Sequence, residues 1–248
     1  MLLSALKRYK KRYLGEKYSE LDEAATRLMV NAFLTDLLGF ASLDEIKTEY
    51  MIKGTYADYV IQIRGKRYFI IEVKKLPTEL SQKHLRQAVN YAANEGIDWA
   101  LLTNGKNFDF YKILFNKPIE SSRVFSIDLS DESKLKSAAE CLQYLTKPLI
   151  LKKGLDYLWN KVSALDPINL SRLLYAKPIL RRLRRQLKRT YKAKFSDEEI
   201  TVALTRIIED KVEGVKPSRK RHRRKRTKEY KNRQFDTEFQ LRMDEAPV

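Results

Sequence analysis

The sequence has 248 residues, with 50 Lys or Arg against 32 Asp or Glu, so its formal net charge is +18. A chain of this length can bury a core without covalent staples, and its single cysteine, Cys141, excludes an internal disulfide and fits a reducing cytoplasm. No run approaches the roughly 18 uninterrupted apolar residues of a membrane-spanning helix. These features predict a soluble cytoplasmic protein with a polyanionic partner.

The first periodic segments predict an α/β core. Residues 19–39 have apolar side chains at helical spacing, with Ser19 as the expected N-cap and Gly39 as the stop signal. A second helix is expected at 81–96. Short runs rich in Ile, Val, Tyr and Phe predict strands, because these residues fit a pleated surface. The expected strands are 46–52, 56–63, 67–74, 99–103 and 108–114, with an additional edge strand around 123–127. This order predicts a mixed sheet.

After about residue 129 the sequence becomes helical and basic. Ser196 followed by Glu199 predicts a capping box that opens a helix. Beyond Gly214 the chain is nearly all charge, and so few apolar residues cannot offset the entropy cost of ordering. We therefore expect a core at 1–129, a helical accessory region at 130–214 and a disordered basic tail at 215–248.

A candidate catalytic pattern lies in the predicted hairpin. Asp58 is on its first strand, Gly65 marks the turn, and Glu72 and Lys74 end the second strand. Side chains alternate along a strand, so Glu72 and Lys74 project to one face. An odd-length turn at Gly65 brings Asp58 to that face, whereas an even-length turn without a bulge does not. The register stays open at this point.

This set of residues suits phosphodiester hydrolysis. Mg²⁺ and Mn²⁺ prefer hard oxygen ligands, which Asp58, Glu72 and the backbone carbonyl of Val73 could provide. A lysine beside the ion can orient or deprotonate the attacking water and stabilise transition-state charge, which is the role expected of Lys74. An acid-x-Lys triplet also arises by chance in a charged chain. The alternative is that Glu72 and Lys74 are solvent-facing charges at a strand end, with Asp58 as a pairing partner.

Several further motifs lie in order around this hairpin. They are a leading helix DEAATRLMVNAFLTDLLGF, in which Glu23, Thr26 and Arg27 form an acid-x-x-Thr-Arg signature, the strands ADYVI and IIEVKK, the helical element QAVNY, and the closing strand pair LLTNGKNFDFYKI. Over residues 19–115 the sequence resembles the PD-(D/E)xK nuclease superfamily. More closely, it is similar to the N-terminal nuclease domain of type I restriction-enzyme restriction subunits and of predicted type IV restriction endonucleases.

The resemblance implies a restriction-endonuclease-like core, with metal ligation by Asp58 and Glu72 and catalytic assistance from Lys74. Ala57 stands where the superfamily name has proline, a loosely kept position. No Walker-type loop or helicase motif is present, so the ATP-driven translocation of type I restriction subunits is not expected.

Three helical residues gain candidate roles from the same resemblance. It implies a supporting catalytic role for Glu23 and active-site or DNA contacts for Gln87 and Tyr91. The residues alone allow plainer interpretations: Glu23 could pair with Arg27 at i+4, Gln87 could be a surface residue, and Tyr91 could be part of the core.

The tail predicts nucleic-acid binding that does not depend on base sequence. Its segment from Lys216 to Arg233 has eleven basic residues and one acid, so counterion release should make binding steeply salt-dependent. The candidate contacts are Arg219, Lys220, Arg221, Arg223, Arg224, Lys225 and Arg226. Upstream, LRRLRRQLKR could also track phosphates, although a solvated helix face is the default explanation of a charge run.

These observations predict a Mg²⁺- or Mn²⁺-dependent endodeoxyribonuclease, a hydrolase that acts in restriction-modification, antiviral defence or DNA processing. The alternative is a nucleic-acid-binding subunit with a nuclease-like fold that is inactive or dormant until it assembles with a partner. RNA stays open as a ligand of the tail. The expected protein partner is a second copy of the chain or an ATPase or methyltransferase subunit.

Overall fold

The computed structural model describes residues 2–41, 43–52 and 54–209. These residues fall into two compact units, and the boundary between Trp159 and Asn160 lies inside helix α6 (Gly154–Ala164). No helix in the described ranges combines the length and apolar character needed to cross a bilayer. The predicted tail and its seven candidate contacts lie outside the described residues, and the predicted domain limits stay predictions.

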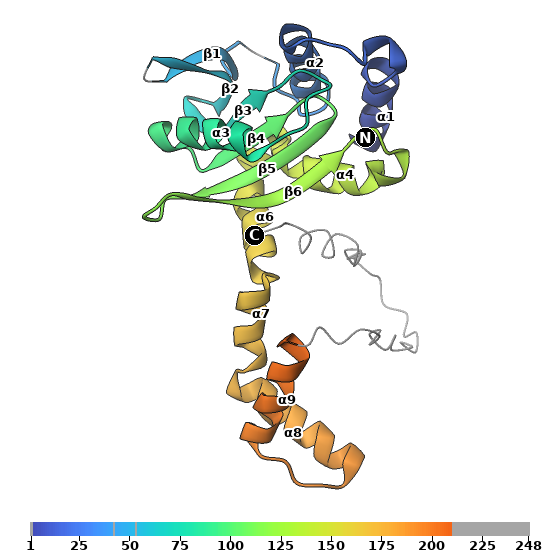
Figure 1. Cartoon of the computed structure of the whole chain (residues 1–248), viewed down its shortest axis with the longest axis vertical. Helices are drawn as coiled ribbons and strands as arrows, with labels where there is room; N and C mark the ends of the chain where they lie inside the picture. The colour runs from blue at the N-terminus through green and yellow to red at the C-terminus, as the bar shows by residue number, and fades with distance from the viewer. Residues whose placement is uncertain (1, 42, 53, 210–248) are drawn as a thin grey trace. The chain divides into compact units, whose positions relative to one another are not determined.

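A six-stranded mixed sheet forms the centre of the first unit (Figure 1). Its strands lie side by side in chain order: β1 (Ile46–Ile52), β2 (Thr55–Ile63), β3 (Lys66–Val73), β4 (Trp99–Thr103), β5 (Asn107–Leu114) and β6 (Glu120–Asp128). Neighbouring strands are antiparallel except β3 and β4, which are parallel because helix α3 (Gln82–Glu95) connects them. The predicted α/β class with a mixed sheet is confirmed.

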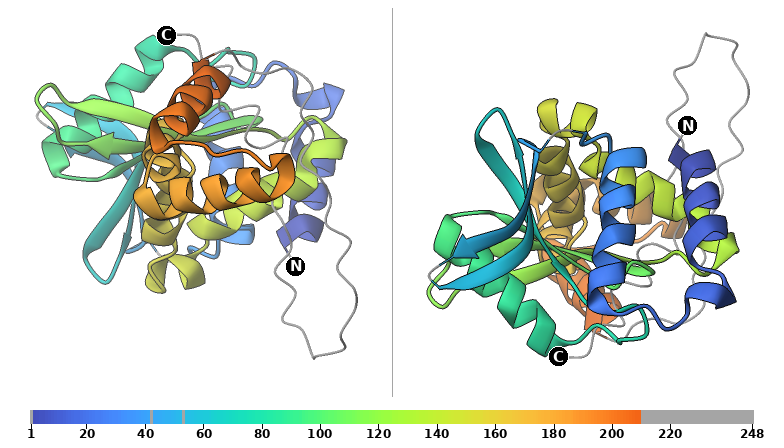
Figure 2. Two further views of the ribbon diagram at one scale, coloured as in Figure 1. Left: turned by 90° about the horizontal axis from the view of Figure 1, so that it is seen from below. Right: turned by 90° about the horizontal axis from the view of Figure 1, so that it is seen from above.

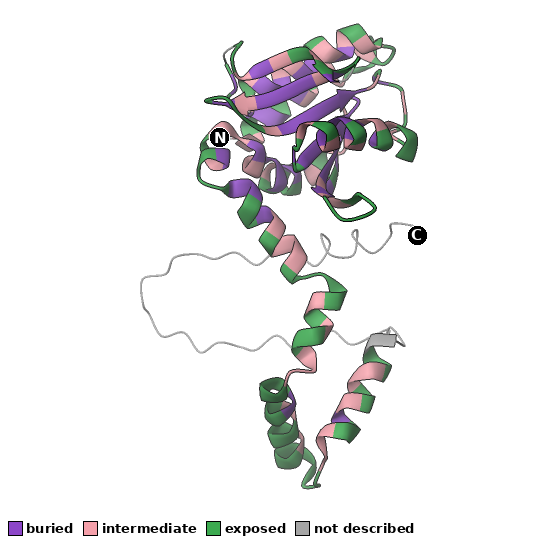
Figure 3. Ribbon diagram, turned by 90° about the vertical axis from the view of Figure 1, so that its left-hand side faces the viewer, coloured by how far each residue is buried: buried purple, intermediate pink, exposed green. Residues whose placement is uncertain are grey.

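Helices cover both faces of this sheet (Figure 2). Helix α3 packs its Leu85, Ala88 and Ala92 against Val60 and Ile70. The opposite face meets α2 (Glu23–Asp36) and α4 (Leu135–Leu142), and α1 (Leu2–Tyr13) packs against these two helices. The short elements of the unit are η1 (Glu16–Tyr18), η2 (Glu132–Lys134), η3 (Gln143–Leu145) and α5 (Lys147–Leu151). Figure 3 shows the sheet as the most continuously buried part of the unit.

Aromatic side chains fill the face of the sheet that lies opposite α3. Phe110 of β5 stacks on Trp99 with ring centroids 5.1 Å apart and on Phe125 at 5.3 Å, and it meets Phe69 edge-on. Its side chain is fully buried. Rings in these geometries add stabilisation beyond the area that they bury.

The predicted N-cap of the leading helix is wrong. Ser19 ends the short helix η1, and α2 begins at Glu23 after Asp22. The Asp22 carboxylate accepts a hydrogen bond from the backbone N–H of Ala25 at 2.7 Å, which satisfies one of the free donors of the first turn. The continuous helix begins only at Glu23, because the three residues before Ser19 form a separate short helix.

The hairpin between β2 and β3 contains a bulge that decides its register. Arg64 and Gly65 form a two-residue turn with φ of 53° and 78°, so Ile63 pairs with Lys66. Farther along, Ile61 pairs with Phe69 rather than with Tyr68, because Tyr68 is an extra residue in β3. The turn is therefore even in length, and the bulge restores the register that an odd-length turn would give.

In the part of the second unit that the structure describes, residues 160–209, the regular elements are helices. Beyond the boundary in α6 these are α7 (Pro167–Leu174), α8 (Lys177–Tyr191) and α9 (Asp197–Glu209). The predicted capping box is confirmed: Ser196 N–H donates to Glu199 Oε2 at 2.7 Å, and Glu199 N–H donates to Ser196 Oγ at 3.1 Å. Pro178 lies in the first turn of α8, where its missing N–H needs no partner.

We predict that Phe110→Ala lowers the free energy of unfolding by about 3–5 kcal/mol, because it removes a buried ring and leaves a cavity. Phe115→Ala is the matched control, since Phe115 is 48% exposed and should change the free energy by no more than about 0.5 kcal/mol. Chemical denaturation of both variants measures the difference. Equal losses would show that the aromatic cluster does not form the core of the sheet.

Candidate active site

One open cleft of about 320 Å³ gathers side chains from α2, β1, β2, α3 and the end of β3. Its lining comprises Glu23, Arg27, Glu49, Tyr56, Ala57, Asp58, Glu72, Lys74 and Gln87. The predicted catalytic set of Asp58, Glu72, Lys74, Glu23 and Gln87 therefore lines a single cleft. These residues are up to 64 positions apart in the sequence, and only the fold brings them together.

The bulge places the two central carboxylates on one face. Tyr59 pairs with Ile71, so the register continued by one residue sets Asp58 across from Glu72. Both oxygens of Asp58 are held. Val73 N–H donates to Oδ2 at 2.7 Å, and Arg27 Nη1 donates to Oδ1 at 3.2 Å. Since N–H and C=O of one strand residue point toward the same neighbouring strand, the Val73 carbonyl also faces the side of Asp58.

Glu72 is carried into the interior by the apolar strand around it. Ile70, Ile71 and Val73 are fully buried, and Glu72 is only 2% exposed. Its Oε1 accepts a hydrogen bond from Lys74 Nζ at 2.6 Å. Its Oε2 is buried and has no hydrogen-bond partner among the described residues. A buried carboxylate oxygen without a partner is costly, which points to a ligand that the folded chain itself does not supply.

The electrostatics of the cleft follow from this burial. Desolvation raises the pKa of Glu72 to about 7, and the neighbouring charge of Asp58 adds to the rise, while the hydrogen bond from Lys74 opposes it. Burial also raises the pKa of Asp58, opposed by the Val73 N–H and by Arg27. For Lys74, burial acts to lower the pKa, but the bond to Glu72 and the charges of Glu23 and Asp58 outweigh it and the pKa is raised.

The donor set fits a hard divalent cation. Asp58 and Glu72 offer carboxylate oxygens on one face, and the unpartnered Glu72 Oε2 is available for coordination. Mg²⁺ is commonly held by one or two carboxylates and keeps several waters. Within the described ranges, no three Asp, Glu, His or Cys side chains converge into a metal cage. A two-carboxylate site completed by a backbone carbonyl is therefore the arrangement that these residues can form.

The structure also locates the remaining candidates. Glu23 is the first residue of α2, beside the N-cap Asp22, and its charge acts on Asp58, Glu72 and Lys74. Tyr91 is 8% exposed and belongs to the core under α3, so it does not line the cleft. Its hydroxyl accepts a hydrogen bond from Gln87 Nε2 at 3.1 Å. Tyr91 is thus in a position to hold Gln87 at the cleft.

The sequence alone predicted no site role for three residues: Arg27, Thr26 and Asn104. Arg27 bonds Asp58 and also approaches Glu49 at 3.5 Å, and no ion pair joins it to Glu23 within the described residues. Thr26 is fully buried and its Oγ1 accepts from the N–H of Leu76 at 3.1 Å. Asn104 Nδ2 donates to the carbonyl of Leu76 at 3.2 Å. These two residues fix the segment after Lys74 against α2 and β4. The acid-x-x-Thr-Arg signature was the available signal for Thr26 and Arg27.

A comparison with protein-family models assigns the part of the chain that forms this cleft. Residues 22–120 match the model described as type I restriction enzyme R protein N terminus. This segment is therefore similar to the N-terminal domain of those R proteins. The match runs from the N-cap of α2 to the first residue of β6 and includes every residue that lines the cleft. The resemblance expected from the sequence is confirmed, and the R protein N-terminal domain fits a role in restriction or defence. The comparisons with curated proteins and with solved structures found no match.

We predict that Mn²⁺ stabilises the wild-type protein, because a ligand that binds only the folded state raises the free energy of unfolding by about 1.4 kcal/mol at ten times its Kd. Glu72→Gln and Asp58→Asn should lose this stabilisation. Glu120→Gln, an exposed carboxylate outside the cleft, should keep it. Thermal denaturation with EDTA or Mn²⁺ measures the effect, and the same Mn²⁺-dependent rise in Tm in all four proteins would exclude the cleft as the metal site.

Proposed function

We propose that this chain is a Mg²⁺- or Mn²⁺-dependent endodeoxyribonuclease, with a restriction-endonuclease-like core, that cleaves DNA phosphodiester bonds in restriction of foreign DNA. The observation that carries the proposal is the buried Glu72 carboxylate. Its Oε2 has no hydrogen-bond partner in the described part of the chain, while Asp58 lies across from Glu72 and Lys74 beside it. The match to the R protein N terminus supports a nuclease-related function in restriction.

The residues of the cleft have distinct tasks in this proposal. Asp58 and Glu72, with the Val73 carbonyl, would hold the metal ion. The chemistry that a bound Mg²⁺ would supply is charge neutralisation at the phosphoryl group and a lowered pKa of its water. Arg27 keeps the Asp58 carboxylate oriented through the bond to Oδ1. The ordered carboxylates then need no rearrangement when DNA binds, which is how preorganised sites lower a barrier.

Lys74 brings positive charge to the reacting phosphate. Its ammonium group lies at the cleft and is fixed by Glu72, so its position relative to the carboxylates is set before substrate arrives. An ammonium group at this position can orient the attacking water and stabilise the negative charge that develops on the phosphate oxygens. Glu23 of α2 also lines the cleft, and its negative charge would raise the pKa of Asp58, Glu72 and Lys74.

We predict that wild-type protein nicks supercoiled plasmid with Mg²⁺ or Mn²⁺ and not with EDTA. Glu72→Gln and Lys74→Ala should each reduce the rate by at least about 100-fold, on the scale of removing one transition-state stabiliser. The controls Glu120→Gln and Lys136→Ala remove the same chemical groups at exposed positions away from the cleft. Plasmids with and without modified cytosine, separated on agarose, give the rates.

The outcomes separate the proposal from its alternative. Cleavage at equal rates by wild type and the two cleft variants would assign the activity to another site or to a contaminant. No cleavage by wild type, with DNA binding and Mn²⁺ stabilisation retained, would favour the dormant subunit, and repeating the assay with a host lysate would then test for an activating partner.

We predict that Gln87→Ala lowers the cleavage rate by about tenfold. The substitution removes a polar contact at the cleft, and a tenfold change corresponds to the net free energy of about one hydrogen bond. Tyr91→Phe should lower it less, since the ring stays in the core and only the hydroxyl that accepts from Gln87 is lost. Rates and Tm are measured together. A larger loss in Tyr91→Phe than in Gln87→Ala, at unchanged Tm, would mean that Tyr91 itself contacts the substrate.

A further inference from the structure

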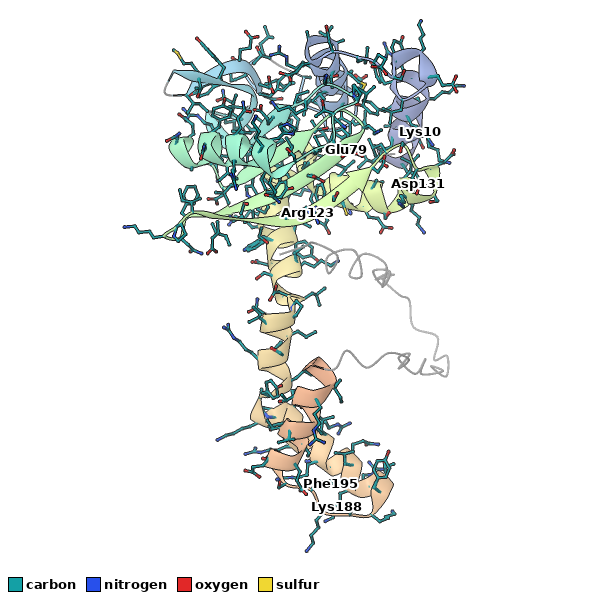
Figure 4. The ribbon with its side chains drawn as sticks, viewed as in Figure 1. Lys10, Glu79, Arg123, Asp131, Lys188 and Phe195 are labelled. Carbon is teal, nitrogen blue, oxygen red and sulfur yellow. The ribbon has the colours of Figure 1, made fainter. Side chains whose placement is uncertain are left out.

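Helix α8 of the second unit presents a continuous basic face. It has seven basic residues and no acidic residue. All seven are exposed: Lys177, Arg181, Arg182, Arg184, Arg185, Lys188 and Arg189. Figure 3 shows most of α8 as exposed, and Figure 4 labels Lys188 on it. At about 100° per residue, these side chains occupy one side of the helix.

The other side of α8 is already used for packing. Leu180 is buried, and Leu183 and Leu187 are half-buried, at the spacing of one apolar stripe. This stripe packs toward α9, whose Ile200 is buried. Because the leucines hold the helical pair together, the orientation of the basic face within this unit is determined by the packing.

The basic face is largely without counter-charges. Among the described residues, Arg184 is the one α8 cation with an ion pair, to Asp197 at 3.0 Å. Arg181, Arg185 and Arg189 follow one another at i,i+4, where like charges repel and destabilise a helix. A helix that merely needed a solvated surface would gain from acids at these positions. A polyanion that lies along the helix would relieve the repulsion.

The chemistry of the face favours a nucleic-acid backbone over a membrane. A helix that binds a bilayer surface buries its apolar stripe in the lipid, whereas the stripe of α8 faces α9. Five of the seven cations are arginines, whose planar guanidinium matches phosphate with two hydrogen bonds. From Lys177 to Lys188 the helix spans roughly 16 Å, about five nucleotides of one strand.

We infer that the basic face of α8 is a second nucleic-acid-binding surface, which contacts the phosphate backbone of DNA independently of base sequence. It lies outside the segment matched to the R protein N terminus and is separate from the proposed cleavage cleft. Its role is to add affinity, with no part in bond cleavage.

The test is binding of the full chain to a 30-base-pair duplex in EDTA, from 50 to 300 mM salt, measured by fluorescence anisotropy. Removing three phosphate contacts with Arg181→Ala, Arg185→Ala and Lys188→Ala should make the slope of log K against log salt shallower by about 2.7. The affinity at 150 mM salt should fall on the order of a hundredfold, if the binding constant extrapolated to 1 M salt is unchanged. Alanine keeps the helix, which circular dichroism checks.

Two controls isolate the surface. A variant with Lys66→Ala, Lys136→Ala and Lys152→Ala removes three exposed charges scattered over the first unit and should leave the slope within about 1 of wild type. Arg181→Lys with Arg185→Lys keeps the charge and should keep the slope. Equal losses in the scattered and the α8 alanine variants would overturn the inference. So would an unchanged slope, or a loss of binding to phosphatidylserine vesicles without a loss of DNA binding.

This readout does not depend on catalysis. EDTA prevents metal-dependent cleavage during the titration, so an inactive protein still reports on α8. Conversely, an α8 variant with normal DNA binding and normal nicking would contradict this inference and leave the proposed nuclease intact.

Discussion

Strand β3 contains one residue, Tyr68, that has no partner in β2. The positions of the cleft residues depend on the bulge that it forms. Without this bulge the two-residue turn would set Asp58 across from Ile71, whose side chain lies on the other face of the sheet. With it, Asp58 faces Glu72, and Val73 N–H can donate to the Asp58 carboxylate. One extra backbone unit thus converts two buried apolar strands into a pair that presents two carboxylates to one cleft.

The burial that follows from this register explains the chemistry of the cleft. Glu72 lies between Ile71 and Val73 in a strand that is covered on both faces, so its charge is desolvated and its pKa is raised. Lys74 donates to one carboxylate oxygen of Glu72, and no residue that the structure describes donates to the other. Helix α2 contributes Arg27 to Asp58, and α3 contributes Gln87. A bound cation would offset the cost of this arrangement, so stability and metal affinity are coupled through the same two carboxylates.

The sequence was sufficient to predict the structure where a local pattern of residues is compatible with only one kind of element. Short runs rich in Ile, Val, Tyr and Phe predicted the strands, and Ser196 with Glu199 predicted a capping box that the hydrogen bonds confirm. It was insufficient where the outcome depends on pairing between distant segments. Nothing in KRYFIIEV marks Tyr68 as the extra residue, so the register stayed open. The bond from Arg27 to Asp58 spans 31 positions and competes with a plausible local partner, Glu23. The core position of Tyr91 follows from packing that the helical period alone left ambiguous.

The most direct test of the account is to locate a metal ion in crystals of the full chain grown with Mn²⁺, by anomalous diffraction above the manganese absorption edge. The account predicts one anomalous peak in contact with the carboxylates of both Asp58 and Glu72, absent from Glu72→Gln crystals grown in the same solution. A peak bound by other residues, or no peak at a Mn²⁺ concentration that raises the Tm of the wild type, would contradict it.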